Sequence, residues 1–337
     1  MKKKILISLL LFTSLYTSGQ DIHFSQFDAS PMNLNPALTG LFNGTYRFVG
    51  NQRKQWSSVP VPYSTFSLSS DMQLPLQLHN TILGGGLLIN TDKAGDSDFK
   101  TIQFGISLAC IKTIGASGKH LLSIGIQPNI TNKNFNTNKL SFDNQYNGEQ
   151  YDPNIATNEN FNTTKILYLD LVMGINWLYK IKKRTAFNIG FATAHLNKAS
   201  QTFFTNQEVV LNQKIVLNAS YQQQVSPYID IIPSALMQKQ GQFSEIVIGT
   251  SIKYLINPRE PTGTALYLGG FYRLKDASIV TVGMDYNNFK AGISYDINTS
   301  GLIPASNHRG GFELSLIYIL QKFTPLKYIK TSCPVFI

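Results

Sequence analysis

The five histidines are the residues of this chain best suited to metal or acid–base chemistry, but their spacing favours neither. His23, His79, His120, His195 and His308 lie far apart, and none stands in a metal-ligand pattern such as His-Glu-x-x-His. We therefore interpret each of them as an isolated side chain. Because no nucleophile is identifiably paired with a base, the sequence predicts no catalytic residues and no enzyme.

Two other short patterns also fail to define a site. Gly118-Lys119 lacks the first glycine and the following Ser or Thr of a phosphate-binding loop. Asp92, Asp96 and Asp98 could offer hard oxygen ligands to calcium, although a solvated acidic turn is the simpler interpretation. The sequence therefore predicts no cofactor, and it leaves calcium binding at the three aspartates open.

The composition is not that of a soluble globular domain. Only 14% of the 337 residues are charged, whereas soluble domains average roughly a quarter. The net charge of +10 comes from basic residues that are scattered singly, which argues against a nucleic-acid-binding stripe. Cys110 and Cys333 are too few for a disulfide scaffold or a Cys-ligated zinc site, so we interpret both as unpaired thiols.

The N-terminus has the layout of a secretory signal peptide. Three successive lysines are followed by an apolar stretch, Ile5–Tyr16, which is too short to span a bilayer, and by the small residues Thr17–Gly19. We expect residues 1–19 to be cleaved, so that the mature chain begins at Gln20 or Asp21 outside the cytoplasm.

From residue 45 onward the dominant pattern is an alternation of apolar and polar residues with a period of two. In the clearest case, residues 166–180, the odd positions are apolar or aromatic, whereas the even positions include Asp170 and Asn176. The polar face carries few of the Lys and Glu residues that normally meet bulk water. Aromatic residues such as Trp177 and Tyr318 lie near strand ends. This pattern predicts a transmembrane β-barrel with a lipid-facing apolar band, aromatic girdles and a polar lumen.

The alternation divides into about 14 antiparallel strands, the even number expected of a bacterial outer-membrane barrel. Their expected starts are Thr45, Pro62, Thr81, Phe99, Lys119, Ile166, Arg184, Gln213, Pro227, Ser244, Ala265, Ser278, Phe289 and Gly310. We assign residues 20–44 to an N-terminal non-helical periplasmic or plug segment, residues 45–322 to the barrel and residues 323–337 to a C-terminal periplasmic tail.

The connections between these strands predict the topology. The long connections, residues 132–165, 196–212 and 299–309, all follow odd-numbered strands, whereas most connections after even-numbered strands are short. Outer-membrane barrels place long loops outside the cell and short turns in the periplasm. The connection from Asp71 to Asn80 is longer than this rule predicts.

The sequence does not decide whether the lumen is open or plugged. Glycines recur at inward-facing positions, namely Gly105, Gly125, Gly174, Gly190, Gly249, Gly269, Gly283 and Gly292. We interpret them first as bends that barrel closure requires. A glycine-lined seat for a plug is the alternative.

The segment before the first strand carries the most specific motifs. Phe24–Phe27 reads Phe-Ser-Gln-Phe, Asn35–Gly40 reads Asn-Pro-Ala-Leu-Thr-Gly, and Arg53–Trp56 reads Arg-Lys-Gln-Trp. These motifs resemble the start of the PorP/SprF family of Bacteroidetes outer-membrane proteins. Its members open with a Phe-Ser-Gln-aromatic segment, an Asn-Pro-Ala-x-x-Gly turn and an Arg-x-Gln-Trp-like strand end. Beyond residue 56 the resemblance is one of length and barrel pattern.

The resemblance implies an accessory role in the type IX secretion system, in the cell outer membrane. Such a barrel would support export and surface anchoring of large secreted proteins, such as the adhesins of gliding motility. It would also contact periplasmic lipoprotein and ring components of the machine. An outer-membrane channel for small or hydrophobic solutes is the alternative, because fatty-acid-transporter-like barrels have a similar strand number and an Asn-Pro-Ala-like N-terminal element.

We expect partner contacts in two regions. The N-terminal segment, in which two prolines restrict the backbone to turns, should either fill the lumen or dock on a periplasmic component. The loop at 132–165 carries aromatic residues that can hold a protein partner outside the cell. The residues expected to make these contacts are Phe24, Phe27, Asn33, Asn35, Pro36, Trp56, Tyr146, Tyr151 and Phe161.

Overall fold

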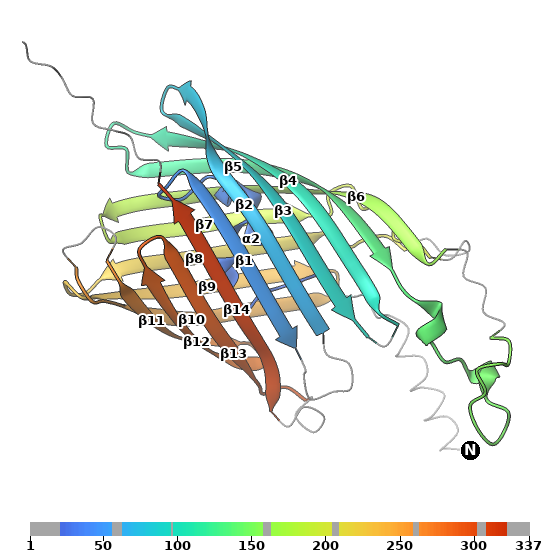
Figure 1. The fold of residues 1–337 in the computed structure, drawn as a ribbon. Helices are drawn as coiled ribbons and strands as arrows, with labels where there is room; N and C mark the ends of the chain where they lie inside the picture. The colour runs from blue at the N-terminus through green and yellow to red at the C-terminus, as the bar shows by residue number, and fades with distance from the viewer. Residues whose placement is uncertain are drawn as a thin grey trace, which may run out of the picture.

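The computed structural model describes residues 21–55, 63–95, 97–157, 163–203, 209–258, 263–301 and 308–321. Fourteen antiparallel strands close into one barrel (Figure 1), which confirms the predicted fold class. The segments expected to be a signal peptide and a C-terminal tail lie outside the described residues, as do Trp56, Asp96, Phe161 and Cys333.

Each strand pairs with its neighbours in sequence, and β1 pairs with β14 to close the barrel. The strands are β1 (Tyr46–Gln55), β2 (Tyr63–Leu78), β3 (Thr81–Ala94), β4 (Phe99–Ile114), β5 (His120–Asn134), β6 (Lys165–Lys182), β7 (Thr185–Ala194), β8 (Lys214–Gln224), β9 (Ile229–Gln240), β10 (Phe243–Leu255), β11 (Ala265–Arg273), β12 (Ala277–Tyr286), β13 (Phe289–Asn298) and β14 (Arg309–Leu320).

One predicted connection is in fact a strand. Residues 71–78 continue β2, so that only His79 and Asn80 connect it to β3. The alternation is hard to follow here because Pro75 lacks an N–H and the β2–β3 register shifts between Leu74 and Leu78. The apparent exception to the loop rule therefore disappears.

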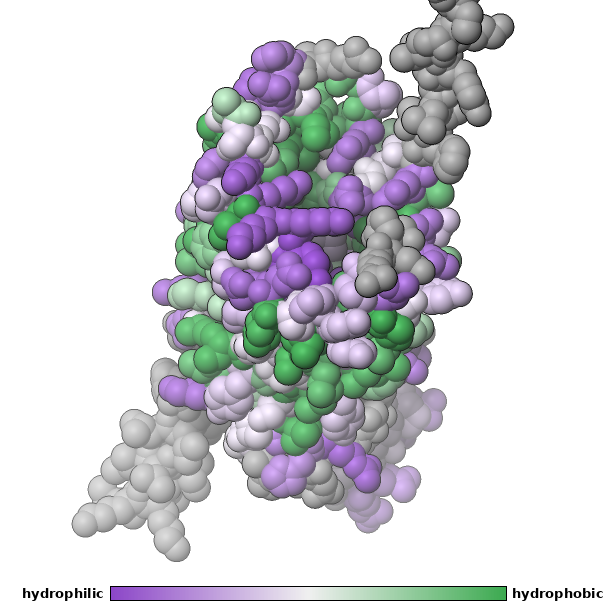
Figure 2. All heavy atoms as spheres, turned by 90° about the vertical axis from the view of Figure 1, so that its left-hand side faces the viewer, coloured by the Kyte–Doolittle hydropathy of each residue, from purple (hydrophilic) through white to green (hydrophobic). Residues whose placement is uncertain are grey.

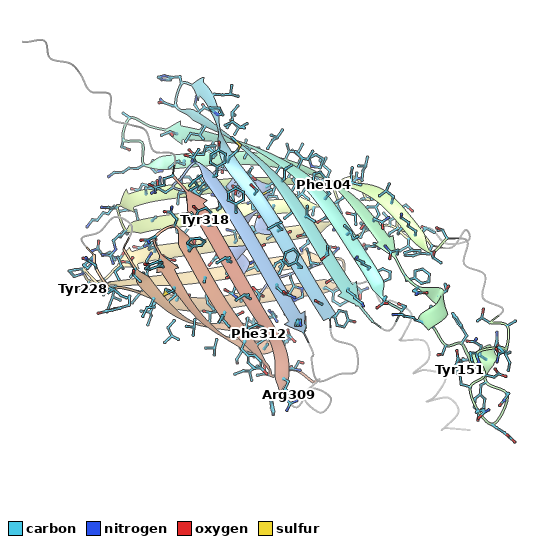
Figure 3. All side chains as sticks on the ribbon, in the orientation of Figure 1. Phe104, Tyr151, Tyr228, Arg309, Phe312 and Tyr318 are labelled. Carbon is cyan, nitrogen blue, oxygen red and sulfur yellow. The ribbon has the colours of Figure 1, made fainter. Side chains whose placement is uncertain are left out.

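The wall has the two faces that the alternation predicts. On β6, Leu167 and Leu169 are 69% and 63% exposed, whereas Asp170 and Asn176 are 3% and 1% exposed. The apolar side chains cover the outside of the barrel (Figure 3), which suits contact with lipid. Among the described residues, no helix is long and apolar enough to cross a membrane.

The two ends of the barrel differ in their connections. The longest connection, residues 135–164, joins β5 to β6 and carries two 3-10 turns, η3 (Thr137–Lys139) and η4 (Asp143–Gln145). It projects beyond the rim as a hook (Figures 1 and 3). The separation into a long-loop end and a short-turn end is not strict. Short turns connect β9 to β10 and β11 to β12 at the long-loop end, and the longer connection of residues 256–264 joins β10 to β11 at the short-turn end.

Residues 21–40, which we call the plug, lie within the barrel. The plug contains three single helical turns, η1 (Phe27–Ala29), α2 (Pro31–Leu34) and η2 (Pro36–Leu38). Proline occupies the first position of α2 and of η2, where its missing N–H costs nothing. Between these two turns Asn35 is extended, and its side chain accepts a hydrogen bond from the N–H of Ala37.

The N-terminal segment extends from one end of the barrel to the other. The N–H of Asp21 donates to Gln240 at the long-loop end of β9. Thr45, which follows the plug, bonds through its N–H to the carbonyl of Leu320 at the short-turn end of β14. The segment therefore runs along the lumen, which is the first of the two positions expected for it.

Candidate functional site

The plug packs on an apolar patch inside the otherwise polar lumen. Phe27 is 5% exposed and meets Phe271 edge to face, with 6.1 Å between ring centroids. The other buried members of this cluster come from the inner faces of β7 to β12 and are Ala192, Val216, Leu236, Val247 and Ile279. Apolar inward positions on one side of the barrel therefore match the apolar side of the plug.

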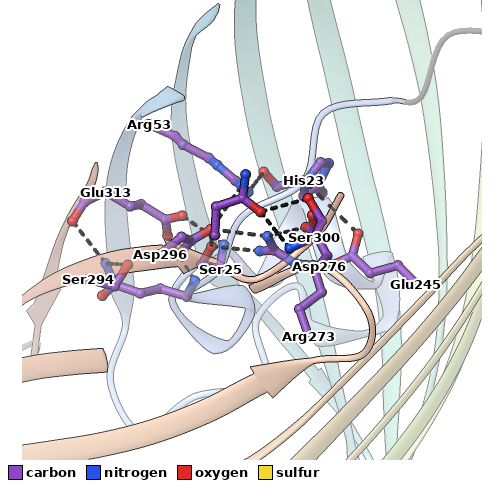
Figure 4. A network of polar contacts seen from close by, with 12 residues as sticks. His23, Ser25, Arg53, Glu245, Arg273, Asp276, Ser294, Asp296, Ser300 and Glu313 are labelled. Carbon is purple, nitrogen blue, oxygen red and sulfur yellow. Dashed lines mark hydrogen bonds and ion pairs between the residues drawn. The ribbon is translucent and has the colours of Figure 1, made fainter. Parts of the chain in front are cut away.

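A buried carboxylate on β14 binds the plug backbone directly (Figure 4). Oε2 of Glu313 accepts the N–H of Ser25 at 2.7 Å, and Oε1 accepts the N–H of Gln26 at 2.9 Å. The side-chain amide of Gln26 also donates to Ser294 at 3.3 Å. Because its two oxygens each accept one backbone N–H, Glu313 fixes this part of the plug against the wall.

Two arginines complete this group, which we call the arginine cluster. Asp296 accepts from Arg53 and from Arg273, each at 3.1 Å. Ser25 lies between them, because its hydroxyl donates to Asp296 and accepts from Arg273, both at 2.8 Å. Arg53 also donates to the carbonyl of His23 at 2.9 Å. Strands β1, β11 and β13 thus meet the plug through one charged network (Figure 4).

His195, which directly follows β7, connects the start of the plug to the wall. Its Nε2 lies 2.6 Å from Oδ2 of Asp21, and its Nδ1 lies 2.9 Å from Oδ1 of Asp170. Burial lowers the pKa of His195, but the two carboxylates raise it more, to about 9. Burial raises the pKa of Asp21, but the bond to His195 and the charge of Lys214 hold it below its usual value.

The interpretation of His195 as an isolated side chain is therefore wrong. It lies 174 positions from Asp21 in the sequence, so the two meet only when the barrel encloses the plug. Both ring nitrogens face carboxylates, which leaves neither free to activate a nucleophile. We call this group the histidine clamp.

A third anchor holds the end of the plug. Arg47 on β1 forms a bidentate pair with Asp71 on β2, at 2.9 and 2.7 Å. Asp71 also accepts the N–H of Gly40 at 2.7 Å, and Arg47 donates to the carbonyl of Leu38 at 3.0 Å. Both charged side chains are buried, so each depends on the other and on the plug.

Glycines on the wall form the seat on which the middle of the plug lies. A Cβ on Gly125 would lie 2.3 Å from the carbonyl carbon of Pro36, and one on Gly174 would lie 2.0 Å from Oδ1 of Asn35. Gly292 faces Gln26 in the same way, whereas a Cβ on Gly190 would meet Asn218 and Asn176 of the wall as well as Asn35 of the plug. These positions correct our first interpretation, because a side chain at any of them would occupy the space of the plug.

Other glycines in that predicted set have different neighbours. A Cβ on Gly249 or Gly269 would meet side chains of the wall itself, including Phe271. The Cβ of Gly105 would meet Asn129, and that of Gly283 the carbonyl of Ala291. The seat is therefore formed by only part of the inward glycines.

A cavity of about 110 Å³ lies beside the histidine clamp, between the plug and strands β3 to β8. Its charged lining residues are Asp21, Asp92, Asp170, Lys133, Lys214 and His195. With His195 protonated, these charges balance. Gln127 also lines the cavity, and its buried Oε1 has no partner among the described residues. Such a lining suits water or small polar molecules better than hydrocarbon.

The structure separates the expected contact residues into two groups. Phe24, Phe27, Asn35 and Pro36 are buried in the lumen, and Asn33 there donates to Ser67 at 2.8 Å. Tyr146 and Tyr151 instead lie on the hook, where they are 59% and 46% exposed (Figure 3). Their partner-binding role stays a prediction.

The two remaining aspartates of the suggested calcium site have other partners. Asp92 accepts the hydroxyl of Thr65 at 2.6 Å, whereas Asp98 is paired with Lys93 and Lys139. Cys110 is a free, exposed thiol. Among the described residues, no group of His, Cys, Asp and Glu is arranged to hold a metal ion.

Sequence reasoning missed most of the anchoring residues. It placed Asp170 on the polar inner face, but there it could not distinguish an anchor from an ordinary polar lumen residue. The partners of Glu313 lie up to 288 positions away in the sequence, beyond the reach of any local pattern. The signals for the plug were the inward glycines and the proline-containing segment before the first strand.

The motifs of the plug and the barrel around it together point to a protein family. The model of the family described as type IX secretion system membrane protein PorP/SprF matches residues 16–318. The chain belongs to this family. The match includes the plug and all but the end of the last strand, so the resemblance seen in the sequence is confirmed. Among curated proteins, none matches the chain significantly.

Solved structures with a similar fold are also outer-membrane barrels. The deltaS2 mutant of the TodX monoaromatic hydrocarbon channel has 10% identity and a TM-score of 0.52, over 88% of this chain and 94% of that chain. The Ralstonia pickettii toluene transporter TbuX has 10% identity and a TM-score of 0.49, over 86% and 92%. A Pseudomonas aeruginosa FadL homologue has 9% identity and a TM-score of 0.49, over 86% and 94%. At such identities the likeness concerns the fold alone.

Proposed function

We propose that this PorP/SprF family member is an accessory barrel of the type IX secretion system, without chemistry of its own. It would support the export and surface anchoring of large secreted proteins, such as gliding adhesins. The observation that carries this proposal is the plug, which the wall holds through the arginine cluster, the histidine clamp and the Arg47–Asp71 pair. A barrel filled in this way suits a platform for partners better than a wide pore.

The hook is the surface we assign to the secreted partner. Tyr146 and Tyr151 form an isolated β-bridge that keeps both rings exposed beyond the rim. Exposed tyrosines that are held rigidly contribute large contact area at low entropic cost. Asp98 in the β3–β4 turn pairs with Lys139 of the hook and with Lys93 of β3. These pairs connect the hook to the barrel.

We assign the periplasmic partners to the opposite, short-turn end. Lipoprotein and ring components of the secretion machine would meet the barrel there. Hydrophilic side chains gather across this mouth (Figure 2). They include Arg184, which is paired with Asp230 at 2.7 Å.

The second candidate is an outer-membrane channel, which the fold likeness to the TodX channel favours. The polar, charge-balanced cavity beside the histidine clamp speaks against hydrocarbon as its solute. Planar-bilayer conductance and uptake of hydrophobic ligands separate the two functions. A large conductance without ligand, or saturable uptake, would favour the channel.

The secretion role is tested on the hook, where substitutions spare the barrel. We expect Tyr146→Ser with Tyr151→Ser to remove most of the secreted adhesin from the cell surface, while the barrel still folds with normal heat-modifiable mobility. The control is Tyr272→Ser, which alters a tyrosine of similar exposure, 43%, on the outer wall of β11 and not on the hook. Unchanged adhesin on intact cells would refute the assignment of the hook.

A further inference from the structure

We propose that the cavity beside the histidine clamp binds a small zwitterion of the α-amino-acid type. The ammonium group of the ligand would lie at Asp92 and its carboxylate at Lys133. Both side chains line this cavity of about 110 Å³, which lies between the plug and strands β3 to β8. The site lies inside the barrel, so it is independent of the proposed secretion role.

Asp92 and Lys133 belong to one row of residues across the wall. In the strand registers Asp92 is opposite Thr101, and Thr101 is opposite Lys133. Thr101 also lines the cavity. Neighbouring strands lie about 4.8 Å apart, so the backbones of β3 and β5 are separated by about 10 Å. A negative and a positive side chain therefore border the same space, with one small side chain between them.

Neither charge is neutralised by a protein partner. Among the described residues, Asp92 and Lys133 take part in no ion pair. Oδ1 of Asp92 accepts the hydroxyl of Thr65 at 2.6 Å, so Oδ2 can accept from a ligand. The ammonium group of Lys133 donates to Gln201 at 2.7 Å and has two further donors. Both charges can therefore bind a ligand without losing their present contacts.

The separation of the two strands suits a ligand that carries both charges. In an α-amino acid the ammonium nitrogen lies about 3 Å from the carboxylate oxygens, and a charge-assisted hydrogen bond at each end adds about 2.8 Å. The ligand with its two bonds thus spans about 9 Å, comparable with the two strand spacings between Asp92 and Lys133. An ion with a single charge would bind only one of the two side chains.

The rest of the lining also favours a ligand without net charge. The charges around the cavity balance when His195 is protonated, so an ion would disturb this balance. The next row of the wall consists of Asn90, Gln103 and Thr131, which hydrogen bond to one another at 2.9 and 3.3 Å. A sugar would need these amides as partners. Because they already bind each other, recognition is left to the charged row.

The size of the cavity limits the ligand to a few heavy atoms, since a single water takes up about 30 Å³ in the liquid. The plug contributes the apolar side chains of Ile22, Met32 and Leu34 to the lining, which can contact a short apolar side chain of the ligand. We therefore choose alanine as the probe. Asp92 lies two residues before the end of β3 at the long-loop end, so the ligand would come from outside the cell.

The test uses the purified protein in detergent micelles and needs no secretion partner. Isothermal titration calorimetry compares alanine with acetate, which carries only the negative charge, and with ethylammonium, which carries only the positive charge. We expect alanine to bind about tenfold more tightly than either ion, because a hydrogen bond to a charged group changes affinity by about this factor or more. Asp92→Asn and Lys133→Gln should each weaken alanine binding by a similar factor.

Lys182→Gln and Asp143→Asn are matched controls, because both side chains are exposed and neither lines the cavity. They should bind alanine as the wild-type protein does. The proposal would be overturned if the wild-type protein did not bind alanine, if D92N and K133Q bound it as tightly as the wild-type protein, or if acetate, ethylammonium or uncharged glycerol bound as tightly as alanine. Should a charge variant fail to fold, Ala194→Leu takes its place. It fills the cavity without altering a charge and should abolish alanine binding, and unchanged binding would refute the site.

Discussion

At the scale of single residues, His195 gives the plug a pH-dependent anchor. Its pKa is raised from 6.5 to about 9 in the folded protein, so its contribution to stability is complete below pH 6.5 and is lost as the pH rises through 9. We expect the difference in unfolding temperature between the wild-type protein and His195→Asn to be constant below pH 6.5 and to shrink toward pH 9. Circular dichroism melts across this range measure it. A difference in unfolding temperature that does not change with pH would contradict the role of the histidine clamp as a pH-dependent anchor.

A second prediction at the scale of residues concerns the pair of Arg47 and Asp71. Arg47→Leu leaves Asp71 buried without its cation, which typically costs about 3–5 kcal/mol. Urea unfolding in lipid vesicles, followed by tryptophan fluorescence, should show a loss of this size. Adding Asp71→Asn should recover part of it, because no unpaired charge then remains. A single variant as stable as the wild-type protein would show that the pair does not hold the plug.

The sequence predicted which face of the wall a residue lies on, but not which residues it contacts. Alternation placed Asp170 and Asn176 on the inner face correctly, since a period of two needs only near neighbours. The partners of Asp296, which include Ser25 and Arg53, come from distant parts of the chain. Pairings of this kind are determined by barrel closure and by the path of the plug, and no local pattern contains either.

At the scale of elements, the plug and its glycine seat fit each other sterically. Gly125→Ala would push a Cβ into the backbone of Pro36, which cannot yield as a flexible side chain can. We expect the plug to loosen by about 1–3 kcal/mol, the usual cost of overpacking. The measurable result is channel openings in planar bilayers that the wild-type protein lacks.

Gly50→Ala is the matched control, because a Cβ at Gly50 would meet nothing within 4 Å. It should leave the barrel as closed as the wild-type protein. If Gly125→Ala and Gly50→Ala conduct equally, the seat does not position the plug, and the inward glycines return to their first interpretation as bends.

The orientation of the barrel follows from its two kinds of connection. With both natural cysteines replaced by serine, Tyr151→Cys on the hook should react with an impermeant maleimide on intact cells. Tyr228→Cys, at the short-turn end, should react only after the outer membrane is opened. The reverse pattern would invert the topology.

Strands were the most predictable elements, and the plug was the least. Each strand begins within two residues of its expected start, because alternation and turns are local signals. The plug has too few apolar residues for a periodic pattern, and its single helical turns depend on Pro31 and Pro36. Its position along the lumen follows from the wall residues that bind it.

At the scale of the whole molecule, the protein is a closed barrel that holds its own N-terminal segment and presents a hook at one end. The central claim is that this barrel supports the surface anchoring of a large secreted protein. The most direct measurement is quantitative antibody labelling of that protein on intact cells of a strain that lacks this chain. The account predicts that the protein is synthesised but is lost from the surface, and that the intact chain restores it. Undiminished surface labelling in the deletion strain would contradict the account.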